Sequence, residues 1–266
     1  MDRKAIFITG AASGIGLATA KRFAGAGWLV GLSDIDAGGL KAALAAVGGD
    51  NAGFTVQHDV RKADDWEQAL DAFVEAAGGR LDVLVNNAGI ARYGWFAEQS
   101  PADFDDQIDI NLRGVVLGAY LGHERLKKTP GSRLINIASA ASLSGSPRLA
   151  VYSATKFAVR GLSEALDIEF MRSGVRVSCV EPTVIETPLL DKASAPGGPN
   201  FREAISRGMG AALPVEDAAE AVWRAAHDEP LHYPVGAGPA AMLEEINPRI
   251  EATRARWSEM FKSGQA

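Results

Sequence analysis

The fold is decided by the stretch AIFITGAASGIG at residues 5–16. The apolar run at 5–9 leads directly into a turn that contains Gly10, Gly14 and Gly16, and residues 17–26 continue with helical spacing. Glycines let backbone N–H groups approach an anion closely, and a helix N-terminus adds a partial positive charge. A glycine triplet is also common in tight strand-to-helix turns, so this order favours a dinucleotide pyrophosphate site without proving one. A Walker loop is excluded, because no Gly-Lys-Ser/Thr follows.

A second signal follows at Asp34, which ends the next apolar run 18 residues after Gly16. This is close to the offset of about 20 residues at which an acid binds the adenosine ribose hydroxyls. A carboxylate there repels a 2′-phosphate, and neither Ser13 nor Ile35 supplies a cation to accept one. The sequence therefore predicts NAD rather than NADP.

Short apolar runs alternate with helical segments along the rest of the chain, at residues 5–9, 29–33, 53–57, 81–86, 132–138, 175–180 and 232–235. This alternation predicts a Rossmann-type, doubly wound three-layer α/β/α sandwich with a mainly parallel seven-stranded sheet. We expect a single domain over residues 1–266, with a substrate lid at about 187–210 around the APGGP stretch at 195–199. A C-terminal extension at about 238–266 is expected to contain a packing helix.

The formal charge of −6 and the pI of about 5.3 argue against a nucleic-acid partner. The apolar run before Thr9 is too short for a signal peptide or a membrane span, so we expect a cytoplasmic protein with no membrane partner. The lone Cys179 lies in an apolar strand and is interpreted as a core residue. The four histidines lie on separate predicted elements, so no metal site is expected.

The candidate chemistry centres on Tyr152 and Lys156, which are four residues apart in a helical segment and therefore share one face. Lowering a tyrosine pKa from about 10 to about 7 needs roughly 4 kcal/mol, much of which a nearby ammonium supplies in a partly dry site. Ser139 closes a strand 13 residues before Tyr152, where parallel sheets place their ligands, and Ser142 competes with it on composition alone.

The sequence at this point resembles the short-chain dehydrogenase/reductase family. The resemblance is carried by TG…GIG at residues 9–16, DV at 59–60, NNAG at 86–89, Asn111, Ser139, YSATK at 152–156 and P…T at 182–187. It implies four catalytic residues, namely Asn111, Ser139, Tyr152 and Lys156. The cofactor-binding residues that we expect are Gly10, Ser13, Gly14, Ile15, Gly16, Asp34, Asp59, Val60, Asn86, Ala88, Gly89, Tyr152, Lys156, Pro182, Ile185 and Thr187.

By this resemblance, Asp59 and Val60 contact the adenine, Ile185 and Thr187 hold the carboxamide, and Asn111 holds a water that links Lys156 to solvent. Thr183 stands where the family usually has glycine, and we expect its side chain to crowd the pocket floor. The resemblance also implies a homotetramer or homodimer built through the helices after Pro101 and around Tyr152.

The predicted function is reversible hydride transfer between NAD and a secondary alcohol or ketone, with Ser139 selected over Ser142 by the family spacing. Mostly apolar candidate walls predict a hydrophobic small-molecule substrate, and the candidate substrate residues are Tyr93, Trp95, Leu143, Leu149, Thr183 and Leu189, with Leu190, Phe201 and Met209 in the lid. The alternatives are an NADPH-dependent ketone reductase, a non-catalytic NAD-binding sensor or scaffold, and an isomerase or dehydratase of the same fold.

Overall fold

The computed structural model describes residues 3–194, 200–208 and 211–262. Its strands are β1 (Ala5–Thr9), β2 (Leu29–Asp34), β3 (Gly53–Gln57), β4 (Val83–Asn86), β5 (Arg133–Ile137), β6 (Arg176–Pro182) and β7 (His232–Val235). They form one seven-stranded sheet in the order β3-β2-β1-β4-β5-β6-β7, and every neighbouring pair is parallel. The predicted parallel sheet and its strand number are confirmed.

The bounds of β1, β3 and β7 are the predicted ones, and those of the other four strands differ by at most two residues at either end. The main difference is β6, which continues to Pro182 because Glu181 and Pro182 pair with Pro234 and Val235 of β7. Sequence periodicity could not locate this end, since the partner strand lies about 50 residues further along the chain.

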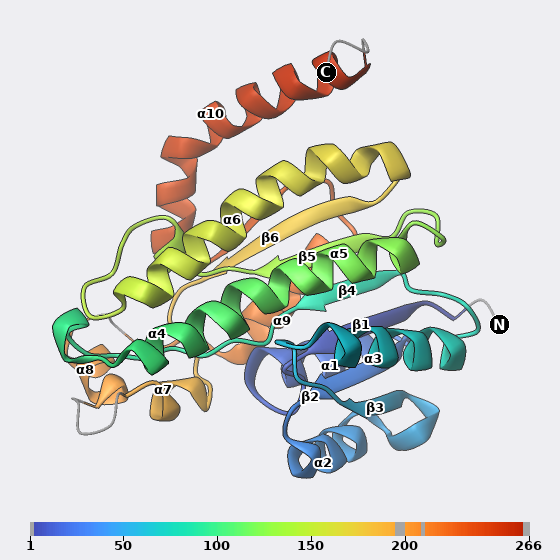
Figure 1. Cartoon of the computed structure of the whole chain (residues 1–266), viewed down its shortest axis with the longest axis horizontal. Helices are drawn as coiled ribbons and strands as arrows, with labels where there is room; N and C mark the ends of the chain where they lie inside the picture. Colours follow the sequence, from blue (N-terminus) through green and yellow to red (C-terminus); the bar gives the residue numbers. More distant parts are fainter. Residues whose placement is uncertain (1–2, 195–199, 209–210, 263–266) are drawn as a thin grey trace.

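Helices cover both faces of the sheet (Figure 1). They are α1 (Gly14–Ala24), α2 (Ala37–Val47), α3 (Ala63–Ala76), α4 (Pro101–Ile108), α5 (Gly114–Leu126), α6 (Ala150–Phe170), α7 (Leu189–Lys192), α8 (Phe201–Gly208), α9 (Val215–Ala225) and α10 (Ala237–Lys262). One apolar core joins α1, α2 and α9 to the sheet, and a second joins α3, α5 and α6 to its other face. The three-layer α/β/α architecture follows directly.

Helix α5 lies unusually close to the sheet, along a seam of Gly114, Gly118 and Gly122. A Cβ on Gly118 would lie 2.2 Å from the side-chain oxygen of Asn86, and one on Gly122 would lie 2.2 Å from Leu84 Cδ2. No larger residue fits at either position. The five residues before this seam, Asp109–Arg113, form a π-helical turn, η3, that joins α4 to α5.

The region predicted as a lid contains α7 and α8, two short helices that the sequence analysis did not identify. Arg202 of α8 pairs with Asp191 of α7 at 2.6 Å and with Glu186 at 2.7 Å, so charge attraction ties this segment together. Residues 195–199 and Met209 lie outside the described residues. In the described ranges, no helix is sufficiently long and apolar to span a membrane.

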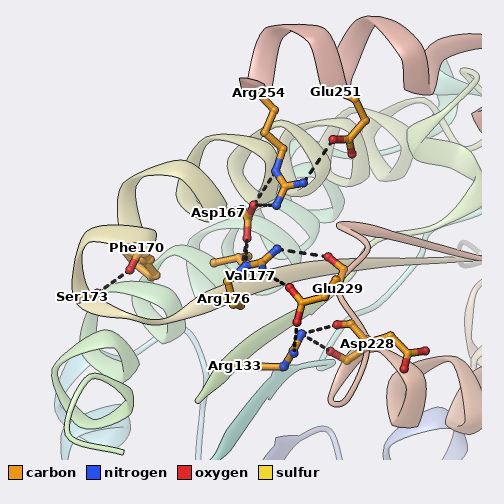
Figure 2. A network of polar contacts seen from close by, with 11 residues as sticks. Arg133, Asp167, Phe170, Ser173, Arg176, Val177, Asp228, Glu229, Glu251 and Arg254 are labelled. Carbon is orange, nitrogen blue, oxygen red and sulfur yellow. Dashed lines mark hydrogen bonds and ion pairs between the residues drawn. The ribbon is translucent and has the colours of Figure 1, made fainter. Parts of the chain in front are cut away.

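The C-terminal extension is a long helix, α10, attached to α6 by a buried carboxylate (Figure 2). Asp167 of α6 is fully buried, and its oxygens accept hydrogen bonds from the Val177 backbone N–H at 3.1 Å, Arg176 Nε at 3.2 Å and Arg254 Nε at 2.7 Å. Arg176 also pairs with Glu229 in the segment before β7. One buried charge therefore holds β6, α6 and α10 together.

Replacing Asp167 by alanine is expected to lower the free energy of unfolding by about 3 kcal/mol, because two arginines and a buried N–H lose their common acceptor. Urea unfolding measures this effect. The matched control is Glu251→Ala, which removes an exposed partner of Arg254 and should cost less than about 0.5 kcal/mol. Equal losses in the two variants would contradict the assigned role of Asp167.

Candidate active site

A cavity of about 680 Å³ opens at the carboxyl ends of the strands, where the strand order reverses between β1 and β4. Its walls include Asp34 and Asp59 after β2 and β3, and Ser139 and Tyr152 beyond β5. A parallel sheet brings these positions to one edge, although they are far apart in the sequence. Most predicted cofactor and catalytic residues therefore line a single continuous cavity.

The junction between β1 and β4 is held by a compact set of hydrogen bonds. Thr9 Oγ1 accepts the backbone N–H groups of Asn87 and Ala88, each at 3.0 Å, and Asn87 Nδ2 donates to the Thr9 carbonyl at 2.8 Å. Thr9 is almost completely buried. The two strand ends are thus fixed relative to each other at the centre of the cavity.

The glycine turn begins immediately after Thr9. Gly10 has φ of +66° and Gly14 of +54°, conformations that residues with a side chain rarely adopt. Both line the cavity together with Ser13 and Ile15, whereas Gly16 does not. A Cβ on Gly16 would lie 2.2 Å from the Gly10 carbonyl oxygen, so Gly16 instead allows α1 to start close against the turn.

Asp34 lies beside this turn at the end of β2. Its carboxylate accepts the backbone N–H of Ala12 at 3.0 Å and that of Asp36 at 3.0 Å, and it lines the cavity. These bonds fix its orientation relative to the glycine turn. The exposed apolar side chain of Ile35 also lines this end of the cavity.

Asp59 and Val60 line the same end, and Asp59 is held by a cation that the sequence analysis missed. Arg61 donates from Nε to Asp59 Oδ1 at 2.9 Å and from a terminal nitrogen to Oδ2 at 2.8 Å. The hydrogen bonds from Arg61 lower the pKa of the Asp59 carboxyl. Arg61 also approaches Asp106 of α4 at 3.8 Å, a long-range pairing for which the sequence offers no signal.

The stretch 86–89 is divided between two roles. Ala88 and Gly89 line the cavity, but Asn86 is buried beneath it and donates to Asn136 Oδ1 at 2.9 Å. Asn86 therefore joins β4 to β5 instead of facing the cavity. The predicted contact of Asn86 with the cofactor has no support in this geometry.

The predicted catalytic residues converge at the middle of the cavity, which Ser139, Tyr152 and Lys156 all line. The Lys156 ammonium donates to the Ile137 carbonyl at 2.8 Å and lies 5.7 Å from the centre of the Tyr152 ring. Ser142, the competing serine, is buried and donates to the Ser139 carbonyl at 2.6 Å. The cavity thus receives Ser139 and not Ser142.

Burial sets the protonation of this group in the protein without cofactor. Burial raises the pKa of the Tyr152 phenol, and a hydrogen bond with Ser139 lowers it in part. Burial also lowers the pKa of Lys156 to about 8. Both shifts disfavour the charged forms that proton transfer requires, because the site is shielded from water.

Asn111 lies in the π-helical turn η3, behind Gly89. Its side chain accepts the Ile90 N–H at 2.8 Å and donates to the Ile90 carbonyl at 2.8 Å, so it pins the loop after β4. A Cβ on Gly89 would lie 3.2 Å from Asn111 Oδ1 and 3.7 Å from Lys156 Nζ, which places both groups around one small residue. The water relay expected for Asn111 stays a prediction.

Pro182, Thr183, Ile185 and Thr187 follow β6 and line the cavity. Thr183, expected to crowd the pocket, packs against Gly236 after β7: a Cβ there would lie 2.9 Å from Thr183 Cγ2. Because Gly236 lacks a side chain, the threonine methyl group has space away from the pocket centre. The sequence could not reveal this compensation, since the two positions follow different strands and are far apart along the chain.

The six predicted substrate residues separate into two groups. Leu149, Thr183 and Leu189 line the cavity, whereas Tyr93, Trp95 and Leu143 do not. Tyr93 is buried against Phe201, with ring centres 4.8 Å apart, and Trp95 is 50% exposed. Leu190, Phe201 and Met242 also line the cavity, and Met242 comes from α10, which the sequence analysis interpreted as a packing helix.

A separate polar cluster lies between β6, β7 and α6. Donor atoms of Cys179, Glu181 and His232 lie within 4.8 Å of one another, and His232 Nδ1 is 2.7 Å from Glu181 Oε1. Burial raises the pKa of the Cys179 thiol well above its ordinary value, so the group is a thiol packed in the core. The prediction that no metal is required stays a prediction.

A model of the short chain dehydrogenase family matches residues 4–196 of the chain. D-threitol dehydrogenase of Mycolicibacterium smegmatis is 39% identical over 229 residues, which is 85% of this chain and 86% of that protein. The 3-alpha-(or 20-beta)-hydroxysteroid dehydrogenase of Mycobacterium tuberculosis is 36% identical over 189 residues, 71% of each chain.

Solved structures of dehydrogenases and reductases are also similar to this chain. A short chain dehydrogenase/reductase from Burkholderia phymatum in complex with NAD has a TM-score of 0.82 and 26% identity, covering 95% of this chain and 96% of that one. The 3-ketoacyl-(acyl-carrier-protein) reductase of Brucella melitensis, complexed with NADH, has a TM-score of 0.76 and 32% identity, covering 87% and 96%.

Because the pKa of Lys156 is lowered, the stability of the folded protein should depend on pH. The folded protein releases this proton near pH 8, whereas an unfolded lysine keeps it to about 10.5, so the unfolded state binds more protons in between and wild-type stability rises with pH over that window. Without cofactor, Lys156→Met is therefore expected to be more stable at pH 7 by about 2 kcal/mol, after loss of the bond to Ile137.

This gain should shrink as the pH rises from about 8 towards 10.5, which urea unfolding at several pH values would reveal. Lys127→Met, at a surface lysine paired with Glu124, is the control and should change little. A Lys156→Met variant that is less stable than the wild type at pH 7 would refute the argument.

Proposed function

The chain belongs to the short chain dehydrogenase family, and on this premise we propose that it transfers a hydride reversibly between NAD and a secondary alcohol or ketone. The observation that carries the proposal is the convergence of Ser139, Tyr152 and Lys156 in the cavity that also contains the glycine turn and Asp34. Together, a hydroxyl, a phenol and an ammonium can transfer a proton and hold the substrate oxygen. A non-catalytic NAD-binding sensor would not need these three residues.

The residues around the glycine turn fit NAD. Gly10 and Gly14 line the cavity at the start of α1, where backbone N–H groups and the helix N-terminus would hold a pyrophosphate. The Asp34 carboxylate is oriented by Ala12 and Asp36, and it can accept hydrogen bonds from both ribose hydroxyls while repelling a 2′-phosphate. Related structures that contain NAD or NADH support the same choice.

In alcohol oxidation, the Tyr152 phenolate takes the proton of the substrate hydroxyl, while Ser139 Oγ holds the substrate oxygen. The carbinol C–H bond breaks and its electron pair leaves as hydride, so the oxygen becomes a carbonyl. The glycine turn and Asp34 would hold NAD, which would supply the hydride acceptor and, in its oxidised form, a positive charge beside Tyr152. In reduction, Tyr152 returns the proton as an acid.

Lys156 makes this proton transfer possible near neutral pH. Burial alone raises the pKa of Tyr152, so an uncompensated phenol would stay protonated. The Lys156 ammonium, held by the carbonyl of Ile137 at the end of β5, lies on the same helix face as Tyr152 and stabilises the phenolate by charge attraction. Keeping the Lys156 ammonium buried is energetically unfavourable, but the buried ammonium is what makes Tyr152 reactive.

The substrate that we propose is a secondary alcohol or ketone with an apolar substituent. Leu149, Leu189, Leu190, Phe201 and Met242 form apolar walls around the catalytic group. Arg92 also lines the cavity, but Asp103 at 3.2 Å and Asp106 at 3.7 Å neutralise it. An anionic group on the substrate is therefore not required.

We further propose that the enzyme is a homodimer or homotetramer built through α5 and α6, which lie side by side in Figure 1. Val116 and Tyr120 of α5 and Phe157 of α6 are exposed, Tyr120 to 74%. Exposed apolar side chains on neighbouring long helices are typical of a surface that another subunit covers.

Replacing Tyr152 by phenylalanine should lower NAD-dependent oxidation of a secondary alcohol by about 1,000-fold, since the proton acceptor is lost. Absorbance of the reduced cofactor follows turnover, and calorimetry should find NAD binding retained. Tyr233→Phe is a matched control, because Tyr233 is also buried but its hydroxyl has no hydrogen-bond partner among the described residues. Full activity of Tyr152→Phe would refute the mechanism.

Replacing Asp34 by alanine should raise the KM for NAD and reduce the preference for NAD over NADP by at least about tenfold, because the repulsion of a 2′-phosphate disappears. The control is Asp36→Ala, which removes a cap on the Gly39 N–H at 3.0 Å but no cavity wall. An unchanged cofactor ratio in Asp34→Ala would contradict the role given to Asp34, whereas a wild-type enzyme that uses NADPH better than NADH with one substrate would favour the NADPH-dependent alternative.

A further inference from the structure

Arg148 has a backbone conformation that its residue type rarely adopts. Its φ is +66°, and among the described residues it alone has positive φ without being glycine. It lies in the loop between Ser139 and α6, four residues before Tyr152. Such a conformation persists only where the surroundings hold it, and residues of this kind gather at functional sites.

The backbone of Arg148 joins two walls of the cavity. Its carbonyl accepts the Gly94 N–H at 3.0 Å, which attaches the loop after β4. The next residue, Leu149, is buried, lines the substrate end of the cavity and immediately precedes α6. The left-handed turn thus directs Leu149 into the cavity while the preceding carbonyl stays bonded to Gly94.

The Arg148 side chain reinforces this attachment through two aromatic rings. Its guanidinium carbon lies 4.3 Å from the centre of the Trp95 ring and 5.7 Å from that of Tyr93. A terminal nitrogen donates to the Tyr93 hydroxyl at 3.3 Å. Cation–π attraction explains why Trp95 lies on the surface instead of in the cavity where it was predicted.

Tyr93 extends the connection to a third wall. Its N–H donates to the Ala193 carbonyl at 2.6 Å, and it forms an isolated β-bridge with Ser194. Its ring packs against Phe201, whose own N–H donates to Ser194 Oγ at 3.0 Å. Phe201 lines the cavity, so the contacts that begin at Arg148 reach the wall formed after α7.

We propose that Arg148 is a positioning residue for the alcohol substrate. It holds together the loop after β4, the loop before α6 and the three residues Ala193, Ser194 and Phe201, so that the substrate walls are set before substrate arrives. Ordering these loops then costs little when the alcohol binds. That the cavity binds an alcohol rests on the proposed function. The contacts of Arg148 with Tyr93, Gly94 and Trp95, which we call the clamp, belong to the cofactor-free protein.

The clamp is tested first without turnover, by hydrogen–deuterium exchange of the cofactor-free protein. Arg148→Gly keeps a residue that accepts φ of +66° but removes the guanidinium. We expect the Tyr93 amide to exchange at least about tenfold faster, with the β5 amides unchanged. Arg148→Ala adds backbone strain and should also accelerate Gly94, whereas Arg148→Lys should fall between wild type and Arg148→Gly.

Arg125→Ala is the matched control, because Arg125 pairs with Asp71 at 2.7 Å and lines no part of the cavity. It should leave the Tyr93 and Gly94 amides unchanged. Unchanged exchange at Tyr93 in Arg148→Gly would overturn the proposal, whether or not the enzyme oxidises alcohols. Absence of turnover in the wild type would instead refute the proposed function, and the exchange result would still decide the clamp.

Kinetics then separate positioning from a general structural role. In Arg148→Gly, the KM for the alcohol should rise about tenfold, while kcat, the KM for NAD and the pH profile stay within about twofold of wild type. The reason is that the clamp shapes only the substrate walls and touches neither the proton acceptor nor the glycine turn. Parallel losses in kcat and in NAD affinity would reject a role specific to the substrate.

Discussion

The hydrogen bonds between Thr9 and Asn87 join the ends of β1 and β4 at the place where the sheet changes direction. The chain leaves β1 towards one face of the sheet and β4 towards the other, and these bonds extend the pairing of the two strands past Ile8 and Val85 to the point where they diverge. Every part of the site is positioned from this junction. The glycine turn starts one residue after Thr9, and Gly89, with Lys156 and Asn111 behind it, lies two residues after Asn87.

Helix α6 carries two buried charged residues and, among the described residues, only one of them is paired with opposite charges. Asp167 is surrounded by donors from β6 and α10, and its charge is matched by Arg176 and Arg254. Lys156, about three turns earlier, donates to a backbone carbonyl, and burial lowers its pKa to about 8. The paired charge anchors the far end of the helix to β6 and α10, and in the mechanism that we propose the buried ammonium supports proton transfer at the near end. Stability and chemistry are thus divided along one helix.

Sequence reasoning located what depends on short-range pattern. The glycine turn, Asp34 and the Tyr152–Lys156 spacing are all local, and the parallel seven-stranded sheet follows from the regular alternation of strands and helices. Sequence reasoning did not predict the contacts between segments that are distant along the chain. Tyr93 and Trp95 were expected in the cavity because they are aromatic and follow β4, but Phe201 and Arg148 hold them elsewhere. Asn86 was carried over from the family pattern, and the buried amide of Asn136 accounts for its inward position.

The π-helical turn before α5 sets the rotation of that helix. Asn111 within the turn must face Ile90, while Gly118 and Gly122 beyond it must face the sheet, where no side chain fits. Each residue of a regular helix advances the side chains by about 100°. A single-residue deletion at 109–113 would therefore swing larger side chains of α5 into the seam or move Asn111 away from its loop. In the evolution of such chains, insertions and deletions should be tolerated in the surface loops and rejected in this turn.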